Sequence, residues 1–139
     1  MDKRNKSGAL DLTAWEALRN LQGRRRSKYG NTKVEYDGYK FDSIAEMKRY
    51  QELKKLVRTG KITDLVLQPK FMIRPAFTRN RKRYRAENYV GDFMYTELPS
   101  MKTVVEDVKS IPTARNRIYV NKRNQFIYQY TSIEHREVM

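Results

Sequence analysis

Hydrophobic and polar positions follow periods that change from one segment of the chain to the next. Apolar residues in 10–21 approximate one face of a helix, and Gly23 ends that segment. Residues 33–41 instead alternate on both sides of Asp37-Gly38, a dipeptide that supplies the positive φ angles of a type I′ turn. The pattern predicts a short N-terminal helix followed by a β-hairpin.

A longer amphipathic segment follows this hairpin. Asp42 or Ser43 can cap a helix whose apolar residues recur at spacings of three and four as far as Val57, and Gly60 ends it. Residues 62–73 are rich in β-branched and large apolar residues but contain Pro69. Because proline has no N–H for a β-ladder, this segment is predicted to form two short strands or one bent strand.

The C-terminal half is predicted to be mostly β-structure. Residues 88–95 and 103–110 read as two strands joined by a turn at 97–100, and we expect them to form an antiparallel pair. Residues 113–123 have weak helical periodicity, and alternating aromatic residues make 126–133 a candidate final strand. The sequence therefore favours an α/β fold.

Length and charge restrict the functional classes. A chain of 139 residues is enough for one domain, which we place at 28–139, after a basic extension at 1–27. Thirty Lys and Arg against sixteen Asp and Glu give a formal charge of +14, which suggests nucleic acid as partner. No apolar run long enough for a membrane span and no apolar signal segment is present, so we expect a cytoplasmic protein without a membrane partner.

Three acids stand in otherwise apolar, strand-like segments: Asp92, Glu106 and Asp107. Side chains alternate along a strand, so Asp107 and Lys109 share one face and Glu106 lies on the other. The chain has no Cys and one His, His135, near its end, so a metal here must be held by oxygen ligands. If a neighbouring strand brings Asp92 beside Asp107, the pair suits Mg²⁺ or Mn²⁺.

Such a site fits phosphodiester hydrolysis, which needs a cation near the phosphate and a deprotonated water. Lys109 could orient the attacking water, help to deprotonate it, or hold a phosphate oxygen, and the sequence does not choose among these roles. The alternative for Asp92 and Asp107 is ordinary pairing with the many Arg side chains.

These residues resemble a known family. Asp92 followed by Asp107-Val-Lys109, together with the runs SKYGNTKVEYDGYKFDSIAEMKRYQEL, LQPKF, YVGDFMY and VVEDVKS, is similar to the PD-(D/E)XK (restriction-endonuclease-like) nucleases. Taken together, these runs resemble in order and sequence a group of small phage-encoded endonucleases related to Holliday-junction resolvases and to the transposase endonuclease subunit of the same fold. The resemblance implies a helix–strand–strand–strand–helix–strand core with a central mixed sheet flanked by helices, here preceded by the β-hairpin and N-terminal helix.

The same resemblance implies a Mg²⁺-dependent endodeoxyribonuclease that acts on branched or structured DNA in phage recombination, replication or packaging, in the cytosol of a bacterial host. It adds Glu46 of FDSIAEM to the metal site, Gln68 of LQPKF beside it, and Lys122 as a helix Lys near phosphate. Each has a structural alternative: Glu46 can complete a capping box with Ser43, Gln68 can be a strand-end polar residue, and Lys122 can be solvated.

Basic runs predict how DNA is held. The expected phosphate-binding residues are Arg24, Arg25, Arg26, Lys28, Arg79, Arg81, Lys82, Arg83 and Arg85. The alternative for the run from Arg24 to Lys28 is a solvated linker. No recognition helix or zinc finger is present, so we expect selectivity for DNA structure rather than sequence. A homodimer, or a phage replication or recombination protein docked on the 10–21 helix, is a further possible partner. The alternative function is a non-catalytic DNA-binding accessory protein on a nuclease-like scaffold.

Overall fold

The computed structural model describes residues 33–139. The chain divides into two compact units, Met1–Glu52 and Leu53–Met139. The predicted helix at 10–21, the predicted domain boundary at 27/28 and the basic residues Arg24, Arg25, Arg26 and Lys28 lie outside the described residues.

In the first unit, the predicted hairpin is confirmed. β1 (Val34–Tyr36) pairs antiparallel with β2 (Tyr39–Phe41), and both turn residues, Asp37 and Gly38, have positive φ. The ring of Tyr50, on helix α2, contacts the rings of Tyr36 and Phe41, and its hydroxyl donates to Asp37 Oδ2 at 2.6 Å. The turn carboxylate is therefore tied to the helix that follows it.

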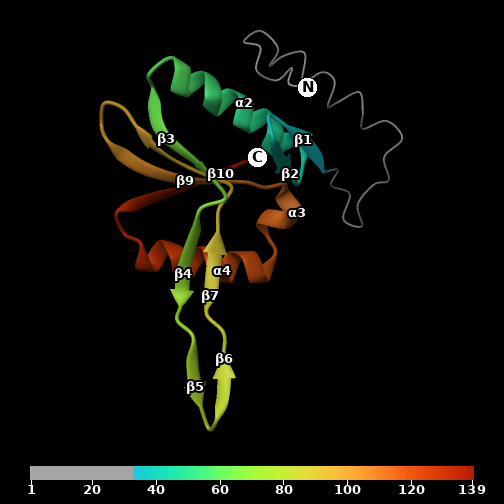
Figure 1. Cartoon of the computed structure of the whole chain (residues 1–139), viewed down its shortest axis with the longest axis vertical. Helices are drawn as coiled ribbons and strands as arrows, with labels where there is room; N and C mark the ends of the chain where they lie inside the picture. Colours follow the sequence, from blue (N-terminus) through green and yellow to red (C-terminus); the bar gives the residue numbers. More distant parts are fainter. Residues whose placement is uncertain (1–32) are drawn as a thin grey trace. The chain divides into compact units, whose positions relative to one another are not determined.

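Helix α2 (Ile44–Arg58) begins in the first unit and ends in the second, close to the predicted bounds. It is followed by the four-stranded sheet of the second unit, whose order is β10-β9-β8-β3 (Figure 1). β3 (Ile62–Leu67) is antiparallel to β8 (Phe93–Glu97), and β8 is antiparallel to β9 (Lys102–Val108). β9 and β10 (Ile133–Val138) are parallel, so the sheet is mixed and the predicted α/β class is confirmed.

One long antiparallel hairpin runs from β3 to β8. Beyond the sheet it continues as β4 (Lys70–Arg74) paired with β7 (Glu87–Val90), then as β5 (Phe77–Arg79) paired with β6 (Lys82–Tyr84) (Figure 1). Its tip is a two-residue turn, Asn80-Arg81, with both φ angles positive. We call β5, β6 and this turn the outer ribbon. Of the two alternatives for residues 62–73, two short strands are confirmed, because β3 ends at Leu67 and β4 starts at Lys70, on either side of Pro69.

Two helices connect β9 to β10. α3 (Ile111–Ala114) is a single turn capped by Ser110, and α4 (Arg117–Gln129) is capped by Asn116. A parallel pair of strands needs such a crossover connection. Phe126 of α4 packs with Ile73, Tyr89 and Val105 in a buried cluster, which fixes α4 against β4, β7 and β9.

Two strand predictions are wrong. The strand expected at 126–133 is wrong, because residues 126–129 belong to α4. The aromatic residues Phe126, Tyr128 and Tyr130 alternate as in a strand, but only Phe126 is buried. Tyr119, Phe126 and Tyr130 instead follow the spacing of a helix face. The strand expected at 88–95 is broken at Gly91-Asp92, between β7 and β8. Within 33–139, no helix is long and apolar enough to cross a membrane.

Candidate functional site

The bend at Gly91-Asp92 lies where the long hairpin leaves the sheet. Gln68 N–H donates to Asp92 O at 2.9 Å, and Gly91 N–H donates to Pro69 O at 3.0 Å, so the two strands stay joined across the bend. A Cβ on Gly91 would lie 2.7 Å from Val105 Cγ1, closer than carbon atoms can approach. Glycine at this position lets the bend cross β9 closely.

Asp92 follows this bend directly and is held by the backbone of β9. Its N–H donates to Glu106 O at 2.9 Å, and its Oδ2 accepts from Val108 N–H at 2.7 Å. Val108 is the residue between Asp107 and Lys109. The structure therefore brings the half-buried carboxylate of Asp92 to the Asp107-Val-Lys109 segment, as the sequence predicted.

Asp107 is fully buried, and its two carboxylate oxygens have different surroundings. The hydroxyls of Tyr89 and Tyr119 donate to Oδ2, and His135 Nε2 lies 2.9 Å from the same oxygen. Among residues 33–139, no group makes a hydrogen bond to the buried Oδ1. The Lys109 Nζ lies 3.8 Å from Oδ1. A buried carboxylate oxygen without a hydrogen bond is costly, and such groups mark ligand sites or catalytic groups.

Lys109 is placed on the same face as Asp107, as strand alternation predicted. Its N–H donates to Val138 O at 2.9 Å, which extends the β9–β10 ladder past the end of β9. Its ammonium lies 4.8 Å from the centre of the Tyr119 ring. With its side chain only 19% exposed, the ammonium is held between a carboxylate and an aromatic face.

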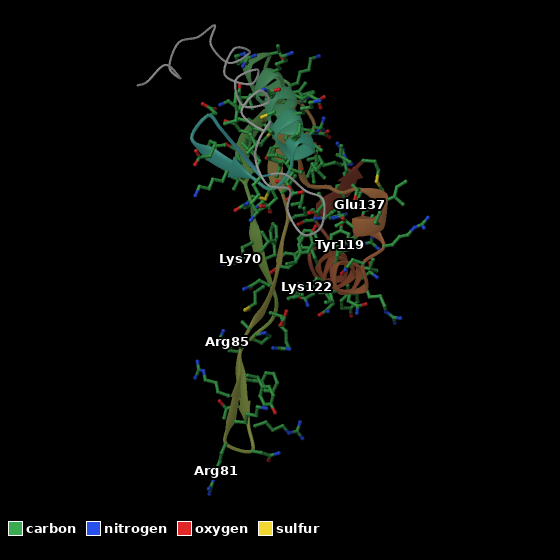
Figure 2. The ribbon with its side chains drawn as sticks, turned by 90° about the vertical axis from the view of Figure 1, so that its right-hand side faces the viewer. Lys70, Arg81, Arg85, Tyr119, Lys122 and Glu137 are labelled. Atoms are coloured by element: carbon green, nitrogen blue, oxygen red, sulfur yellow. The ribbon has the colours of Figure 1, made fainter. Side chains whose placement is uncertain are left out.

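Tyr119 links this segment to a second ion pair. Its single hydroxyl proton is shared between Asp107 Oδ2, at 3.2 Å, and Glu137 Oε2, at 2.7 Å (Figure 2). Arg123 Nη1 lies 2.7 Å from the same Glu137 oxygen. Burial raises the pKa of the Tyr119 phenol, and the hydrogen bond to Glu137 and the charge of Asp107 raise it further. Burial alone would raise the pKa of Glu137, but Tyr119 and Arg123 lower it overall. At neutral pH a protonated phenol therefore donates to the ionised carboxylate of Glu137.

Glu106 lies apart from these groups, on the opposite face of β9. It is buried, pairs in register with Phe93, and accepts a hydrogen bond from the Tyr95 hydroxyl. Gln68 has a left-handed backbone, φ 52°, at the bend beside the Asp92 carbonyl. The structure thus gives Gln68 a backbone role next to the site.

Glu46 takes part in capping α2 with Ser43, as the sequence allowed, and its side chain also bonds to the neighbouring Asp42. Its N–H donates to Ser43 Oγ at 3.1 Å, and its Oε1 accepts from Asp42 N–H at 3.3 Å. The structural role of Glu46 at the start of α2 is therefore observed. Its part in a metal site stays a prediction.

The predicted DNA-binding residues that the structure describes lie in two places. Arg79, Arg81, Lys82 and Arg83 belong to the outer ribbon, and Arg85 follows it directly; all are exposed. Lys122 is on α4, where its Nζ lies 3.3 Å from Glu87 Oε1, so this lysine has an acidic partner.

Tyr89, Tyr119 and His135 are not among the site residues that the sequence predicted. His135, which is near the end of the sequence, lies in β10, has a side chain only 7% exposed, and stands opposite Val105 of β9. Parallel pairing of β10 with β9 brings it to Asp107. The local signal was weak, since only the β-branched and charged run at 133–138 indicated a strand.

The described residues contain no group of three or more His, Cys, Asp or Glu side chains that could hold a metal ion. Asp92 and Asp107 instead offer carboxylate oxygens from neighbouring chain segments, with an ammonium beside them. Oxygen donors of this kind suit hard divalent cations.

The fold and site define a basic, mixed α/β protein with a buried carboxylate and a lysine at one end of a mixed sheet. The family model described as "Protein of unknown function (DUF1064)" matches residues 26–139 of the chain. The chain therefore belongs to this family. No match was found among curated proteins or among solved structures.

Proposed function

We propose that the protein is a metal-dependent DNA endonuclease that hydrolyses phosphodiester bonds at Asp92, Asp107 and Lys109. The observation that carries the proposal is the asymmetry of Asp107. Three neighbours occupy Oδ2, while the buried Oδ1 has no hydrogen bond within the described part of the chain and faces Lys109 at 3.8 Å. Side chains that only stabilise a fold are normally satisfied at both oxygens.

The residues fit a Mg²⁺ or Mn²⁺ ion. Asp107 Oδ1 is a buried acceptor that lacks a donor, and Asp92 has its Oδ2 fixed by the Val108 N–H. The Asp107 side chain is held through its other oxygen, Oδ2, by Tyr89, Tyr119 and His135. Hydrogen bonds of this kind set the orientation of a metal-binding side chain. A divalent cation bound there would offset charge on the phosphate and make a water molecule easier to deprotonate.

The protein's own groups then have separate tasks. Asp92 and Asp107 provide the carboxylates, and the Asp107 orientation is set by the buried hydroxyls. The Lys109 ammonium, held against Tyr119, is positioned to bind a phosphate oxygen or to orient the attacking water. The high pKa of Tyr119 keeps its proton on the phenol, so Tyr119 acts as a positioning residue rather than as a base.

The order of elements supports the proposal. Apart from the hairpin extension and the single-turn α3, the elements follow the order α2, β3, β8, β9, α4, β10. The Asp107-Val-Lys109 segment is at the end of β9, the third strand in this order. This is the order that a resemblance to the PD-(D/E)XK nucleases implies. The formal charge of +14 supports DNA as the substrate. Branched or structured DNA is our proposed substrate because the described chain offers no helix with the features of a sequence reader.

The proposal is tested by incubating the protein with supercoiled plasmid and with a four-way junction, in Mg²⁺, Mn²⁺ or EDTA. Wild type is expected to nick DNA only with a divalent ion. Asp92→Asn, Asp107→Asn and Lys109→Met are each expected to lower the rate at least about a hundredfold while leaving DNA binding intact.

Glu106→Gln is the matched control. Glu106 is as buried as Asp107 and adjacent to it, but it lies on the other face, and glutamine can still accept from Tyr95. The control is expected to cut at the wild-type rate. A second readout is thermal stability: Mn²⁺ at about 100 times its Kd adds about 2.7 kcal/mol to a folded protein that binds it. Wild type and Glu106→Gln should show this gain, and Asp107→Asn should not.

Two results would contradict the proposal. Equal cutting by Asp107→Asn and wild type would remove the site assignment. DNA binding by wild type without cutting in any divalent ion would favour the non-catalytic accessory function.

A further inference from the structure

The long hairpin projects its basic end beyond the sheet. Between Lys70 and Ala86 the chain has seven Lys or Arg and no acid, which is half of its formal charge of +14. Figure 2 shows Arg81 at the tip, Arg85 further back and Lys70 near the base. Every residue from Arg74 to Arg83 is exposed, and β5 and β6 pair only with each other within the described residues.

Four of the seven cations in this segment are not neutralised by acids of the described fold. No acid in residues 33–139 makes an ion pair with Arg79, Arg81, Arg83 or Arg85. By contrast, Lys122 and Arg123 on α4 are paired with Glu87 and Glu137. Surface cations without acidic partners, gathered on one projecting element, fit a polyanion rather than the protein's own core.

The outer ribbon has structural features that hold its shape. The rings of Phe77 and Tyr84 stack across the two strands with centroids 4.6 Å apart and planes 9° apart. Arg74 and Lys82 lie over these rings at 5.3 and 5.2 Å. The turn uses left-handed residues at both positions, which matches the twist of a two-residue hairpin. These contacts support the backbone from which the exposed cations project.

The ribbon's shape and length fit duplex DNA. The major groove of B-DNA, about 12 Å wide, admits a two-stranded β-ribbon, whereas the minor groove is only about 6 Å wide and would have to be widened. The ten residues from Lys70 to Arg79, at about 3.3 Å each, reach about 30 Å from the bend beside Asp92. One turn of B-DNA is about 34 Å.

We infer that the outer ribbon lies in the major groove of a DNA duplex and contacts its phosphates about one helical turn from the bond held at Asp107. The cutting distance rests on the proposed function, whereas the groove contact does not. The substrate class that follows is DNA with a double-stranded arm of at least about 8–10 base pairs on the ribbon side of the cut. Junctions and flaps with long arms meet this condition, and single strands do not.

The inference is tested by binding in EDTA, without cutting. The ribbon variant is Arg79→Gln, Arg81→Gly and Arg83→Gln, in which glycine suits the left-handed turn position. The control is Lys55→Gln, Arg58→Gln and Lys61→Gln, which removes the same charge at the α2–β3 connection. This connection precedes Ile62, which pairs with Glu97 at one end of the β3–β8 ladder. The hairpin that carries the ribbon leaves the sheet at the opposite end, where Leu67 pairs with Phe93.

Fluorescence anisotropy is measured with labelled duplex DNA, duplex RNA and single-stranded DNA of about 20 units, a length close to two turns of B-DNA. If three phosphate contacts are lost, affinity for duplex DNA at about 0.1 M salt should fall up to about 500-fold, and the slope of log affinity against log salt should become less negative by about 2.7. The control should change far less. Duplex RNA, whose major groove is too deep and narrow to enter, should show no difference between ribbon variant and control.

The outcomes separate the two proposals. Ribbon-dependent DNA binding by a protein that never cuts would leave this inference standing and remove the nuclease. Cutting by wild type, with equal DNA affinities for the ribbon variant and the control, would overturn the inference alone. An equal loss of affinity for duplex DNA, duplex RNA and single strands would also overturn it, because it would show a charge effect without groove entry.

Discussion

Substituting Gly91 with alanine should distort the bend that carries Asp92. The added Cβ would lie 2.7 Å from Val105 Cγ1, while the next atoms, Glu106 O and Pro69 Cγ, are both at 3.6 Å. Val105 is fully buried and cannot rotate away freely. Overpacking of this kind costs about 1–3 kcal/mol. For a chain of this size, we expect Gly91→Ala to lower the Tm by about 3–12 °C.

The structure attributes this loss to a single contact, so a second substitution should reverse part of it. Val105→Ala removes Cγ1 and leaves a cavity, at about 1–3 kcal/mol by itself. In the double variant the alanine Cβ at position 91 no longer meets that methyl group. The double variant should therefore lose less stability than the sum of the two single variants, by at least about 1 kcal/mol.

Urea unfolding of the four proteins, followed by circular dichroism, measures this coupling. Additive losses would refute the reasoning, since they would mean that the Val105 methyl is not what excludes a side chain at Gly91. Nuclease activity gives a separate readout. If the proposed function holds, Gly91→Ala should cut more slowly than its loss of stability explains, because Asp92 is the next residue along the bend.

Three further predictions follow from single contacts. Glu46→Gln keeps a side chain that can still cap α2, so its free energy of unfolding should change by less than about 0.5 kcal/mol, whereas Ser43→Ala should lose about 1 kcal/mol. A loss of DNA cutting by Glu46→Gln with unchanged stability would indicate a role beyond capping. Tyr119→Phe removes the hydroxyl that bonds to Asp107 and Glu137, and should lower the free energy of unfolding in urea by about 1–2 kcal/mol. The loss should be no larger, because Asp107 keeps Tyr89 and His135 and Glu137 keeps Arg123. An unchanged stability would contradict the observed hydrogen bonds. Hydrogen bonds from Arg136 and Lys102 lower the pKa of Glu134 from 4.5 to about 2, so ionised Glu134 stabilises the fold above pH 4.5 and this contribution disappears as the pH falls toward 2. The Tm difference between wild type and Glu134→Gln should shrink over that pH range, and a constant difference would contradict the pairing.

Local pattern was sufficient for much of the fold. Asp37-Gly38 specified a hairpin turn because few dipeptides accept two positive φ angles, and apolar spacing specified α2. Strand alternation placed Asp107 and Lys109 together and Glu106 away from them, since a period of two requires only a regular strand. These features depend on residues close together in sequence.

Tertiary structure alone determined the surroundings of Asp107. Tyr89, Tyr119 and His135 come from β7, α4 and β10, separated from Asp107 by 18, 12 and 28 positions, and they meet because β10 pairs parallel to β9 across the α4 crossover. Periodicity also misassigned Phe126, whose burial depends on packing against β4 and β7 rather than on its neighbours in sequence. The sequence by itself thus determined the β1–β2 hairpin, helix α2 and the faces that Asp107 and Glu106 take on β9. Only the packing of distant elements determined which carboxylate oxygen is occupied, because burial and hydrogen-bond partners depend on contacts that local periodicity does not encode.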